Sequence, residues 1–385
     1  SDAITMASDG TCTAKITGMT GGGGLSNRNI IVNGDMRVAQ RSVGPIAVSD
    51  NTNEGYQTID RMRFGFGNSA AGACNISQST DAPTTLGFTK SHKTDVTTVN
   101  TTASGQQVIQ MFYRIEGQDI RNSGWNHLSS SSFLTLSFYF KTTKTGTSKL
   151  PIMFRTRHGT NYYYVKNVTV TDPTNWNRYT VTIPGNSNIQ IDDANTVGMD
   201  INFTYYSGPD KDTSSEGSWG STNAYSTSDS TNYFDSTSND MFITGIQLES
   251  GDTATSFEHR SYGDELQRCQ RYCYAAVADG SIDNYAPLAN GRFYNASDAQ
   301  FNIFFPVTMR YPPTLDSATT AAGTFFYNTG GGFGGVEATN IGLNERAYNS
   351  ATVYTQGASG QTAGNGTTLY CHDSEVAKLI FTAEL

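Results

Sequence analysis

The stretch that decides the fold reads Phe133-Leu134-Thr135-Leu136-Ser137-Phe138-Tyr139-Phe140-Lys141. Leu134, Leu136, Phe138 and Phe140 alternate with a mixed set of aromatic and hydroxyl side chains. A period of two places alternate side chains on opposite faces of a β-strand. The stretch therefore predicts a strand that buries one face in a core, while serine and threonine keep the other face wet without charge.

The same rhythm of short alternating segments and polar turns extends from Asn27 to about Arg260. We expect strands at residues 61–66, 107–115, 133–141, 149–155, 162–170, 177–183, 196–206 and 241–248. Eight strands at this spacing are typical of two packed sheets. The pattern predicts an all-β protein whose residues 27–260 form a β-sandwich.

Composition agrees with this fold class and argues against two kinds of partner. Of 385 residues only 15% are charged and 11% are aromatic, so hydroxyl, amide and glycine residues supply most of the polar surface. The formal net charge of −9 offers no basic field for a phosphate backbone, which argues against nucleic acid. No apolar run approaches the ~20 residues of a membrane span, and the first residues do not resemble a secretory signal. We expect a soluble protein that is not exported by a signal peptide and does not insert into a membrane.

Two segments stand outside the strand pattern. Residues 1–26 combine a short alternating stretch with the glycine run 21–24, which predicts an arm and a hinge that dock on a larger body or meet other copies of the chain. Residues 207–239 are rich in serine, threonine, aspartate and glycine and contain Trp219, Tyr225, Tyr233 and Phe234. Loops of this length are functional or disordered, and the aromatic residues favour an ordered, exposed excursion.

The pattern changes to a helical one at residues 261–276. Leu266, Cys269, Gln270 and Cys273 fall on one face at helical spacing, and Ser261 is a candidate N-cap. This helix would cover the end of the sandwich or, if the chain assembled as a trimer, lie near the three-fold axis. Residues 277–385 again show β patterns, with strands expected at 299–306, 324–327 and 378–384, and predict a smaller C-terminal β domain.

Cysteine usage points to buried thiols. Five cysteines lie at wide, irregular spacing, unlike a disulfide framework: Cys12, Cys74, Cys269, Cys273 and Cys371. A metal site at Cys269 and Cys273 would need two further ligands that the neighbouring sequence does not offer. We therefore expect small, buried, apolar side chains.

Several motifs resemble a module found in tail-fibre and other virion proteins of marine and other bacteriophages. They are Asn29–Arg41 (NIIVNGDMRVAQR), Thr58–Arg61 (TIDR), Ile243–Gly251 (ITGIQLESG), Thr255–Tyr262 (TSFEHRSY), Glu265–Tyr272 (ELQRCQRY) and Phe305–Leu315 (FPVTMRYPPTL). The first five bracket residues 27–275, and their combination is more specific than any one of them.

The resemblance implies a carbohydrate-binding-module-like jelly roll followed by a terminal β domain, in proteins that assemble as homotrimers. It also implies a place in the virion, after assembly in the host cytoplasm, with the arm at residues 1–26 contacting tail or capsid proteins. It implies no activity, and it leaves the attachment point on the virion open.

The sequence offers little for an enzyme or a metal. The segment Gly65–Ala70 has dinucleotide-like glycine spacing but no helix pattern after it, and the five histidines are scattered. A pair of carboxylates could cleave a glycan if two of these met: Asp35, Asp60, Glu116, Glu249 and Glu258. We expect Glu249 and Glu258 instead to hold a turn or to neutralise Arg61 or Arg260. We predict no catalytic residue, no cofactor and no metal site, although Asp35 and Glu249 are candidate ligands should a structural Ca²⁺ be present.

Aromatic side chains provide the candidate ligand contacts. Sugars bind in water through aromatic faces and through side-chain amides and carboxylates that satisfy their hydroxyls. The candidates are Trp219, Tyr162, Tyr164 and Trp125, the two tyrosines sharing a strand face. The alternative for Trp125, as for Trp176, is a place in the sandwich core.

Three functions are compatible with these observations. The first is a trimeric tail fibre that adheres to host-surface polysaccharide through several weak sites, since multivalency raises avidity by about 10² to 10⁴. The second is a structural head, neck or tail component whose aromatic residues form protein interfaces. The third is a glycan-cleaving enzyme. The sequence favours the first.

Overall fold

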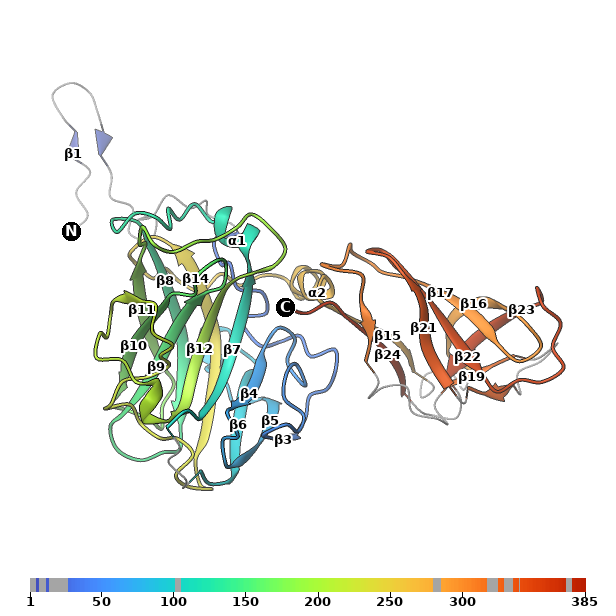
Figure 1. Cartoon of the computed structure of the whole chain (residues 1–385), viewed down its shortest axis with the longest axis horizontal. Helices are drawn as coiled ribbons and strands as arrows, with labels where there is room; N and C mark the ends of the chain where they lie inside the picture. The colour runs from blue at the N-terminus through green and yellow to red at the C-terminus, as the bar shows by residue number, and fades with distance from the viewer. Residues whose placement is uncertain are drawn as a thin grey trace. The chain divides into compact units, whose positions relative to one another are not determined.

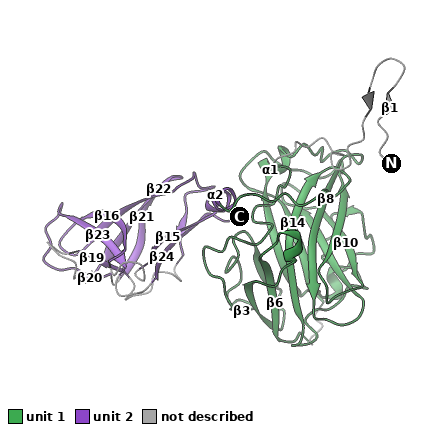
Figure 2. Cartoon of the chain, turned by 180° about the vertical axis from the view of Figure 1, so that it is seen from behind, with its two compact units in different colours: residues 1–262, 385 green, residues 263–384 purple. Residues whose placement is uncertain are grey.

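The structure is a computed structural model that describes residues 5–6, 12–13, 27–100, 105–279, 285–316, 325–328, 335–338, 340–371 and 376–385. The chain divides into two compact units, residues 1–262 with 385 and residues 263–384 (Figure 2). Apart from the paired strands β1 (Thr5–Met6) and β2 (Cys12–Thr13), the predicted arm lies outside the described residues. None of the described helices is long and apolar enough to cross a membrane.

The first unit is a sandwich of two antiparallel sheets, each with six described strands (Figure 1). One sheet has the order β13 (Trp219–Gly220), β10 (Tyr163–Val170), β9 (Ser148–Thr156), β12 (Val197–Ser207), β7 (Val108–Glu116) and β4 (Arg63–Gly67). The other has the order β11 (Asn177–Pro184), β8 (Phe133–Thr142), β14 (Asp240–Ser250), β6 (Ser91–Thr98), β5 (Ala73–Ser79) and β3 (Ile46–Ser49). Short helical segments interrupt the connections at α1 (Gly117–Arg121), η1 (Thr84–Leu86) and η2 (Pro209–Lys211).

The core between the sheets follows the alternation of β8. Leu134, Leu136, Phe138 and Phe140 are all completely buried, and the Phe138 ring contacts Phe203 of β12 at a centroid distance of 5.0 Å. The prediction of an all-β sandwich with this inward face is confirmed. The prediction of a solvent-exposed second face is wrong for Thr135 and Ser137. These residues are buried because the chain beyond β14 packs over them. Thr135 Oγ1 donates to the Gly251 carbonyl at 2.7 Å.

One helix follows the sandwich, but it is shorter than expected. Helix α2 spans Tyr262–Gln270, and β15 (Cys273–Asp279) occupies the remainder of the predicted helix. Cys273 pairs with Thr382 in the register of β15 and β24 (Val376–Thr382). The pairing with a strand about a hundred residues away overrides the local helical spacing, which ends at Gln270.

The second unit contains a three-stranded and a seven-stranded antiparallel sheet among its described residues. The smaller sheet has the order β15, β24 and β18 (Thr314–Leu315). The larger has the order β20 (Val336–Glu337), β19 (Phe325–Tyr327), β23 (Gly366–Cys371), β16 (Pro287–Phe293), β17 (Ala299–Phe304), β22 (Ser350–Gln356) and β21 (Asn340–Arg346). Phe301 and Val353 of the larger sheet belong to the same buried cluster as Leu379 and Phe381 of the smaller one.

The cysteines are core residues where the structure describes their side chains. Cys74, Cys269, Cys273 and Cys371 are all completely buried, as predicted. Burial raises the pKa of the Cys74 thiol well above its usual range, so this side chain stays protonated and unreactive. The side chain of Cys12 lies outside the described residues.

Candidate functional site

A groove lies on the seven-stranded sheet of the second unit. It measures about 1000 Å³ and is formed by β16, β17, β21 and β22. Its lining is Asn290, Gly291, Arg292, Tyr294, Asp298, Gln300, Asn302, Asn344, Glu345, Thr352, Tyr354 and Gln356. Apart from one glycine, every member carries a polar group.

Strand alternation explains why these polar side chains share one face. In β17, Ala299, Phe301 and Ile303 are buried against the core, so Gln300 and Asn302 point to the opposite face. The neighbouring strand β22 behaves in the same way, with Val353 buried and its two neighbours directed into the groove. Gln300 lies opposite Tyr354, and Asn302 lies opposite Thr352. Two adjacent strands thus present a ladder of amide, hydroxyl and phenol groups.

Two amide side chains of the groove, those of Asn302 and Asn290, are held in place by hydrogen bonds to their carbonyl oxygens. Thr352 Oγ1 donates to Asn302 Oδ1 at 3.2 Å, and Thr368 Oγ1 donates to Asn290 Oδ1 at 3.0 Å. The amide nitrogens of Asn302 and Asn290 form no hydrogen bond with a described residue, so each keeps two donor hydrogens for a ligand. Such donors match the oxygen-rich surface of a carbohydrate.

Aromatic rings lie at three places along this face. Tyr294 is 60% exposed and stands at a turn that is held by Tyr294 N donating to the Asp298 carbonyl at 2.8 Å. Tyr354 lies in the middle, over Gly342 of β21. Phe304 is 74% exposed and shares its strand face with Gln300 and Asn302. The five residues from Gln300 to Phe304 span about 14 Å at the usual strand rise, which suits a short oligosaccharide better than a single small molecule.

The charges in the groove are few and mixed. Arg292 contributes one positive charge, and Asp298 and Glu345 contribute two negative ones. Asp298 is held in its turn, where Asn295 Nδ2 donates to its Oδ2 at 2.7 Å. A groove with a small net negative charge is suited to a neutral ligand and repels a polyanion.

The predicted aromatic contacts lie in the other unit, and two of them meet. The rings of Tyr164 and Trp219 are 5.4 Å apart at the sheet edge where β13 pairs with β10. Trp219 Nε1 donates to the Pro184 carbonyl at 2.7 Å, and Tyr162 packs against the same core cluster. Trp125 is 4% exposed, and its Nε1 donates to the Ser132 carbonyl at 3.1 Å. All four rings contribute to packing, and their role as ligand contacts stays a prediction.

The long segment at residues 207–239 is ordered but not an exposed excursion. Tyr233 and Phe234 are completely buried and Tyr225 is nearly so, because the segment folds back onto the sandwich. Tyr233 N donates to the Tyr205 carbonyl at 2.8 Å, and its hydroxyl lies 2.9 Å from Ser148 Oγ. The expectation of exposed aromatic residues is therefore wrong, since these rings complete the core.

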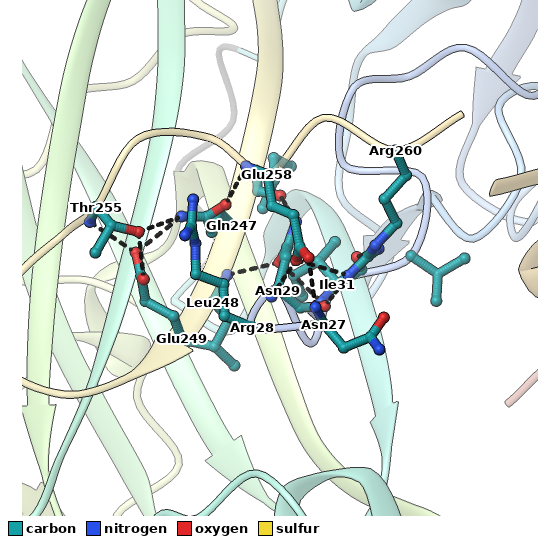
Figure 3. Close-up of polar contacts among 12 residues, drawn as sticks. Asn27, Arg28, Asn29, Ile31, Gln247, Leu248, Glu249, Thr255, Glu258 and Arg260 are labelled. Carbon is teal, nitrogen blue, oxygen red and sulfur yellow. Dashed lines mark hydrogen bonds and ion pairs between the residues drawn. The ribbon is translucent and has the colours of Figure 1, made fainter. Parts of the chain in front are cut away.

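The chain enters the sandwich at residues Asn27–Ile31 and leaves it at residues Gln247–Arg260. A set of hydrogen bonds joins these two segments, and an ion pair lies within the second; we call these contacts the clasp (Figure 3). Glu258 accepts hydrogen bonds from the main-chain nitrogens of Asn27 and Asn29 and pairs with Arg260 at 3.2 Å. Glu249 accepts from Thr255 N at 2.9 Å and from Thr255 Oγ1 at 2.6 Å. The prediction that these carboxylates hold a turn and neutralise Arg260 is confirmed.

The other three carboxylates that the sequence offered for glycan cleavage also have protein partners. Asp35 pairs with Arg37 at 2.5 Å, Gln40 N donates to Asp60 Oδ1 at 2.9 Å, and Gln118 Nε2 donates to Glu116 Oε2 at 2.6 Å. Within the described ranges, no group of three or more histidine, cysteine, aspartate or glutamate side chains could hold a metal ion. Asp35 and Glu249, the candidate Ca²⁺ ligands, are engaged with Arg37 and Thr255.

Comparisons with known proteins give likenesses of backbone shape alone. No family model matches the sequence, and no curated protein matches it. A putative sugar-binding protein from Bacteroides thetaiotaomicron is similar at 10% identity and a TM-score of 0.31, covering 57% of this chain and 99% of that one. A family 11 carbohydrate-binding module from Clostridium thermocellum, in complex with a mixed-linked tetrasaccharide, is similar at 13% identity and a TM-score of 0.27, covering 55% and 96%.

A tailspike domain also appears among the similar structures. The enzymatically active domain of tailspike protein 4 of bacteriophage CBA120 is similar at 11% identity and a TM-score of 0.30, covering 58% of this chain and 21% of that one. At these identities and TM-scores the function must be argued from the residues of this chain.

Sequence reasoning missed the groove, although one signal of it is visible. The predicted strand at 299–306 has Gln300, Asn302 and Phe304 opposite its apolar side, an unusual set for a solvent-facing surface. The strands that complete the groove, β16, β21 and β22, were not predicted. Their register brings the remaining lining residues together from positions 290 to 356.

Proposed function

We propose that this chain is a non-enzymatic virion fibre protein of a bacteriophage that adheres to host-surface glycan through the groove of its second unit. The observation that carries the glycan part is the ladder of Gln300, Asn302, Thr352 and Tyr354 on one outward sheet face. Amides and hydroxyls satisfy sugar hydroxyls, and exposed rings cover the C–H patches of the sugar. The groove has both components.

The virion part is supported by the sequence resemblance at residues 27–275 and by the clasp that its motifs build. Asn29–Arg41 and Thr255–Tyr262 resemble phage fibre segments, and parts of both form the contacts among Asn29, Glu258 and Arg260. Homotrimerisation belongs to the same proposal. Three copies would present three shallow grooves, and multivalency then raises the avidity of each weak site.

An open groove fits adhesion. Its lining consists mainly of short amide and hydroxyl side chains with limited charge, which favours reversible recognition of a neutral polymer. Asp298 is tied to Asn295 within its own turn, a contact that fixes the position of its carboxylate.

One observation favours a second candidate, a glycan depolymerase. Two carboxylates, Asp298 and Glu345, line the same groove, and a pair of carboxylates is the usual catalytic set of glycoside hydrolases. If the groove cleaves its ligand, Asp298→Asn and Glu345→Gln will abolish the release of new reducing ends while binding persists.

The test is retention of the purified chain on immobilised host-surface polysaccharide, with reducing ends measured in the same samples. We expect retention with no increase in reducing ends, and a trimer by light scattering. Asn302→Ala should reduce retention, whereas Asn175→Ala, a change to an exposed asparagine of the first unit, should not. The proposal is contradicted if the chain is not retained on host polysaccharide, or if the Asn302→Ala variant is retained as well as the wild type.

A further inference from the structure

Four arginines lie on the outward face of the sandwich sheet that contains β4, β7, β12 and β9. They are Arg63 of β4, Arg114 of β7, and Arg155 and Arg157 at and just beyond the end of β9. Alternation along the strands explains their direction, because Phe64, Ile115 and Phe154 beside them are buried in the sandwich core. Strand register therefore places four positive charges on one surface of a chain whose net charge is −9.

The described residues supply these arginines with one carboxylate, that of Asp200 on β12. Asp200 is completely buried and lies opposite Arg114 and Arg155 in the sheet. Its Oδ1 is 3.5 Å from Arg114 Nε, and its Oδ2 is 2.8 Å from Arg155 Nε and 3.9 Å from Arg157 Nε. Arg63 forms no ion pair with a described residue, so a single negative charge faces four guanidinium groups.

The four positive charges repel one another. Burial lowers the pKa of Arg157, and the neighbouring Arg155 and Arg114 lower it further. Burial also lowers the pKa of Arg114, with further contributions from Arg63 and Arg155. A guanidinium group nevertheless keeps its proton in a protein at neutral pH. Loss of a proton therefore does not relieve this repulsion, whereas a bound anion would.

The ring of Phe112 supports two of the guanidinium groups. Arg63 Cζ lies 4.8 Å and Arg114 Cζ 5.4 Å from the centroid of this ring, and Phe112 itself is 4% exposed. A cation–π contact uses the face of a guanidinium group and leaves the N–H donors at its edge available. Arg63 and Arg114 are thus held side by side without using up their donors.

Most N–H donors of the exposed arginines are unused. No described residue accepts a hydrogen bond from the guanidinium group of Arg63 or Arg157. Among the described residues Arg114 makes one such bond, from Nη1 to the Leu385 carbonyl at 2.6 Å. The side chains of Arg157 and Arg114 are 31% and 18% exposed, and Arg63 is half-buried. A ligand can therefore reach all three from the solvent.

We infer that Arg63, Arg114 and Arg157 bind a phosphate group beside Arg114. The planar fork of a guanidinium group matches two oxygens of a phosphate, and the phosphate brings the negative charge that the cluster lacks. A neutral sugar would bring no such charge. A nucleic acid fits poorly, because the patch is limited to four side chains on an otherwise acidic chain. The inference goes beyond the proposed function and does not depend on it, because the groove lies in the other unit and suits a neutral ligand.

The test is calorimetric titration of the full chain with inorganic phosphate at constant ionic strength, set with sodium chloride. We expect phosphate to bind and to raise the temperature of thermal unfolding, because it binds the folded state. Arg63→Gln and Arg157→Gln should each weaken binding about tenfold, as expected for the loss of a charge-assisted hydrogen bond. Lys90→Gln is the control. It removes a positive charge next to β6 of the other sheet, where salt screens the charge, and should change binding less than about twofold.

The stability of the variants separates loss of the site from loss of the fold. In phosphate-free buffer neither variant should unfold more easily than the wild type, because Arg63 has no ion pair with a described residue and the loss of Arg157 reduces like-charge repulsion. A glycerol phosphate polymer then identifies the source of the group. Binding tighter per phosphate than that of inorganic phosphate indicates a phosphate carried on a surface polymer, and equal binding indicates a free anion. The inference is overturned if phosphate does not bind, or if folded Arg63→Gln and Arg157→Gln bind it as tightly as the wild type.

Discussion

The ring of Tyr354 lies directly against Gly342 on the neighbouring strand, where a Cβ added to the glycine would come within 2.6 Å of Tyr354 Cε1. Real Cβ atoms do not approach other heavy atoms this closely, so the glycine is what allows the ring to lie flat over β21. Tyr354 is also the central aromatic residue of the groove. The position of this ring is therefore set by a residue that itself carries no side chain.

Gly342→Ala is the first prediction that follows. The added methyl group should displace the Tyr354 ring and weaken glycan binding about tenfold, which corresponds to about 1.4 kcal/mol. The unit should remain folded because the ring lies on the outward face of the sheet. Titration with a host oligosaccharide, alongside the circular dichroism spectrum, checks both parts. Unchanged affinity in a folded Gly342→Ala protein would mean that the ring position does not matter for binding.

His92 predicts a pH dependence of stability. Its side chain is completely buried, its ring stacks on Phe64 at 6.3 Å, and burial lowers its pKa from 6.5 to about 4. Between these values the unfolded chain binds a proton that the folded chain does not, so stability falls as pH falls from 6.5 towards 4. The loss from this group reaches about 3 kcal/mol near pH 4.

Thermal unfolding measured from pH 7 to pH 4 checks this slope. His92→Phe keeps an aromatic ring beside Phe64 but cannot take up a proton, so the variant should unfold with a shallower pH dependence. Parallel profiles for the wild type and His92→Phe would show that other groups cause the acid sensitivity.

We expect the loss of the Asp200 charge to have a large effect on the free energy of unfolding. It is completely buried in β12 and lies opposite Arg114 of β7 and Arg155 of β9. Arg155 Nε donates to Asp200 Oδ2 at 2.8 Å, and Arg157 Nε lies 3.9 Å from the same oxygen. Asp200→Asn leaves these guanidinium groups without their buried counterion, so we expect a loss of about 3–5 kcal/mol in the free energy of unfolding.

An exposed ion pair provides the control for Asp200. Asp235 pairs with Lys144 at 2.7 Å, and its side chain is 46% exposed. Asp235→Asn should change the free energy of unfolding by no more than about 1 kcal/mol. Urea unfolding of both variants compares them, and similar small losses would show that the arginine cluster is solvated well enough to need no counterion.

A variant of Trp219 distinguishes a role in packing from a role in ligand binding. Because its ring lies against Tyr164 and its Nε1 bonds the Pro184 carbonyl, we expect Trp219→Ala to lower the free energy of unfolding by about 2 kcal/mol. Glycan affinity per folded molecule should stay the same. A folded Trp219→Ala protein that loses glycan binding would restore the sequence-based assignment of this residue to a ligand site.

Local patterns predicted the elements that alternate cleanly. The apolar residues of β8 gave the inward face of the sandwich, and the predicted strands at 149–155, 162–170 and 177–183 correspond closely to β9, β10 and β11. Strands β5 and β6, with sequences ACNISQS and SHKTDVTT, were missed because polar residues stand at both faces. Their burial arises from neighbouring strands, which the local sequence does not reveal.

The candidate site depended even more on non-local pairing. Trp125 and Tyr164, two of the aromatic residues predicted to bind sugar, are large and apolar and are buried in the core. The groove instead uses Asn290, Gln300 and Tyr354 from three strands, which share a surface only once the register of β16, β17 and β22 is known. Composition could suggest an amide-rich binding face, but it could not say which amides meet.

The central claim is that the groove on the seven-stranded sheet binds host glycan. Calorimetric titration of the full chain with an oligosaccharide from the host surface tests it through a matched pair of tyrosine variants in the same unit, Tyr354→Ala in the groove and Tyr311→Ala outside it. Tyr311 is 56% exposed and does not line the groove, so its loss controls for a general effect of removing a surface ring. We predict that Tyr354→Ala weakens binding at least tenfold while Tyr311→Ala changes it less than about twofold. Equal affinities for the two variants and the wild type would contradict the claim.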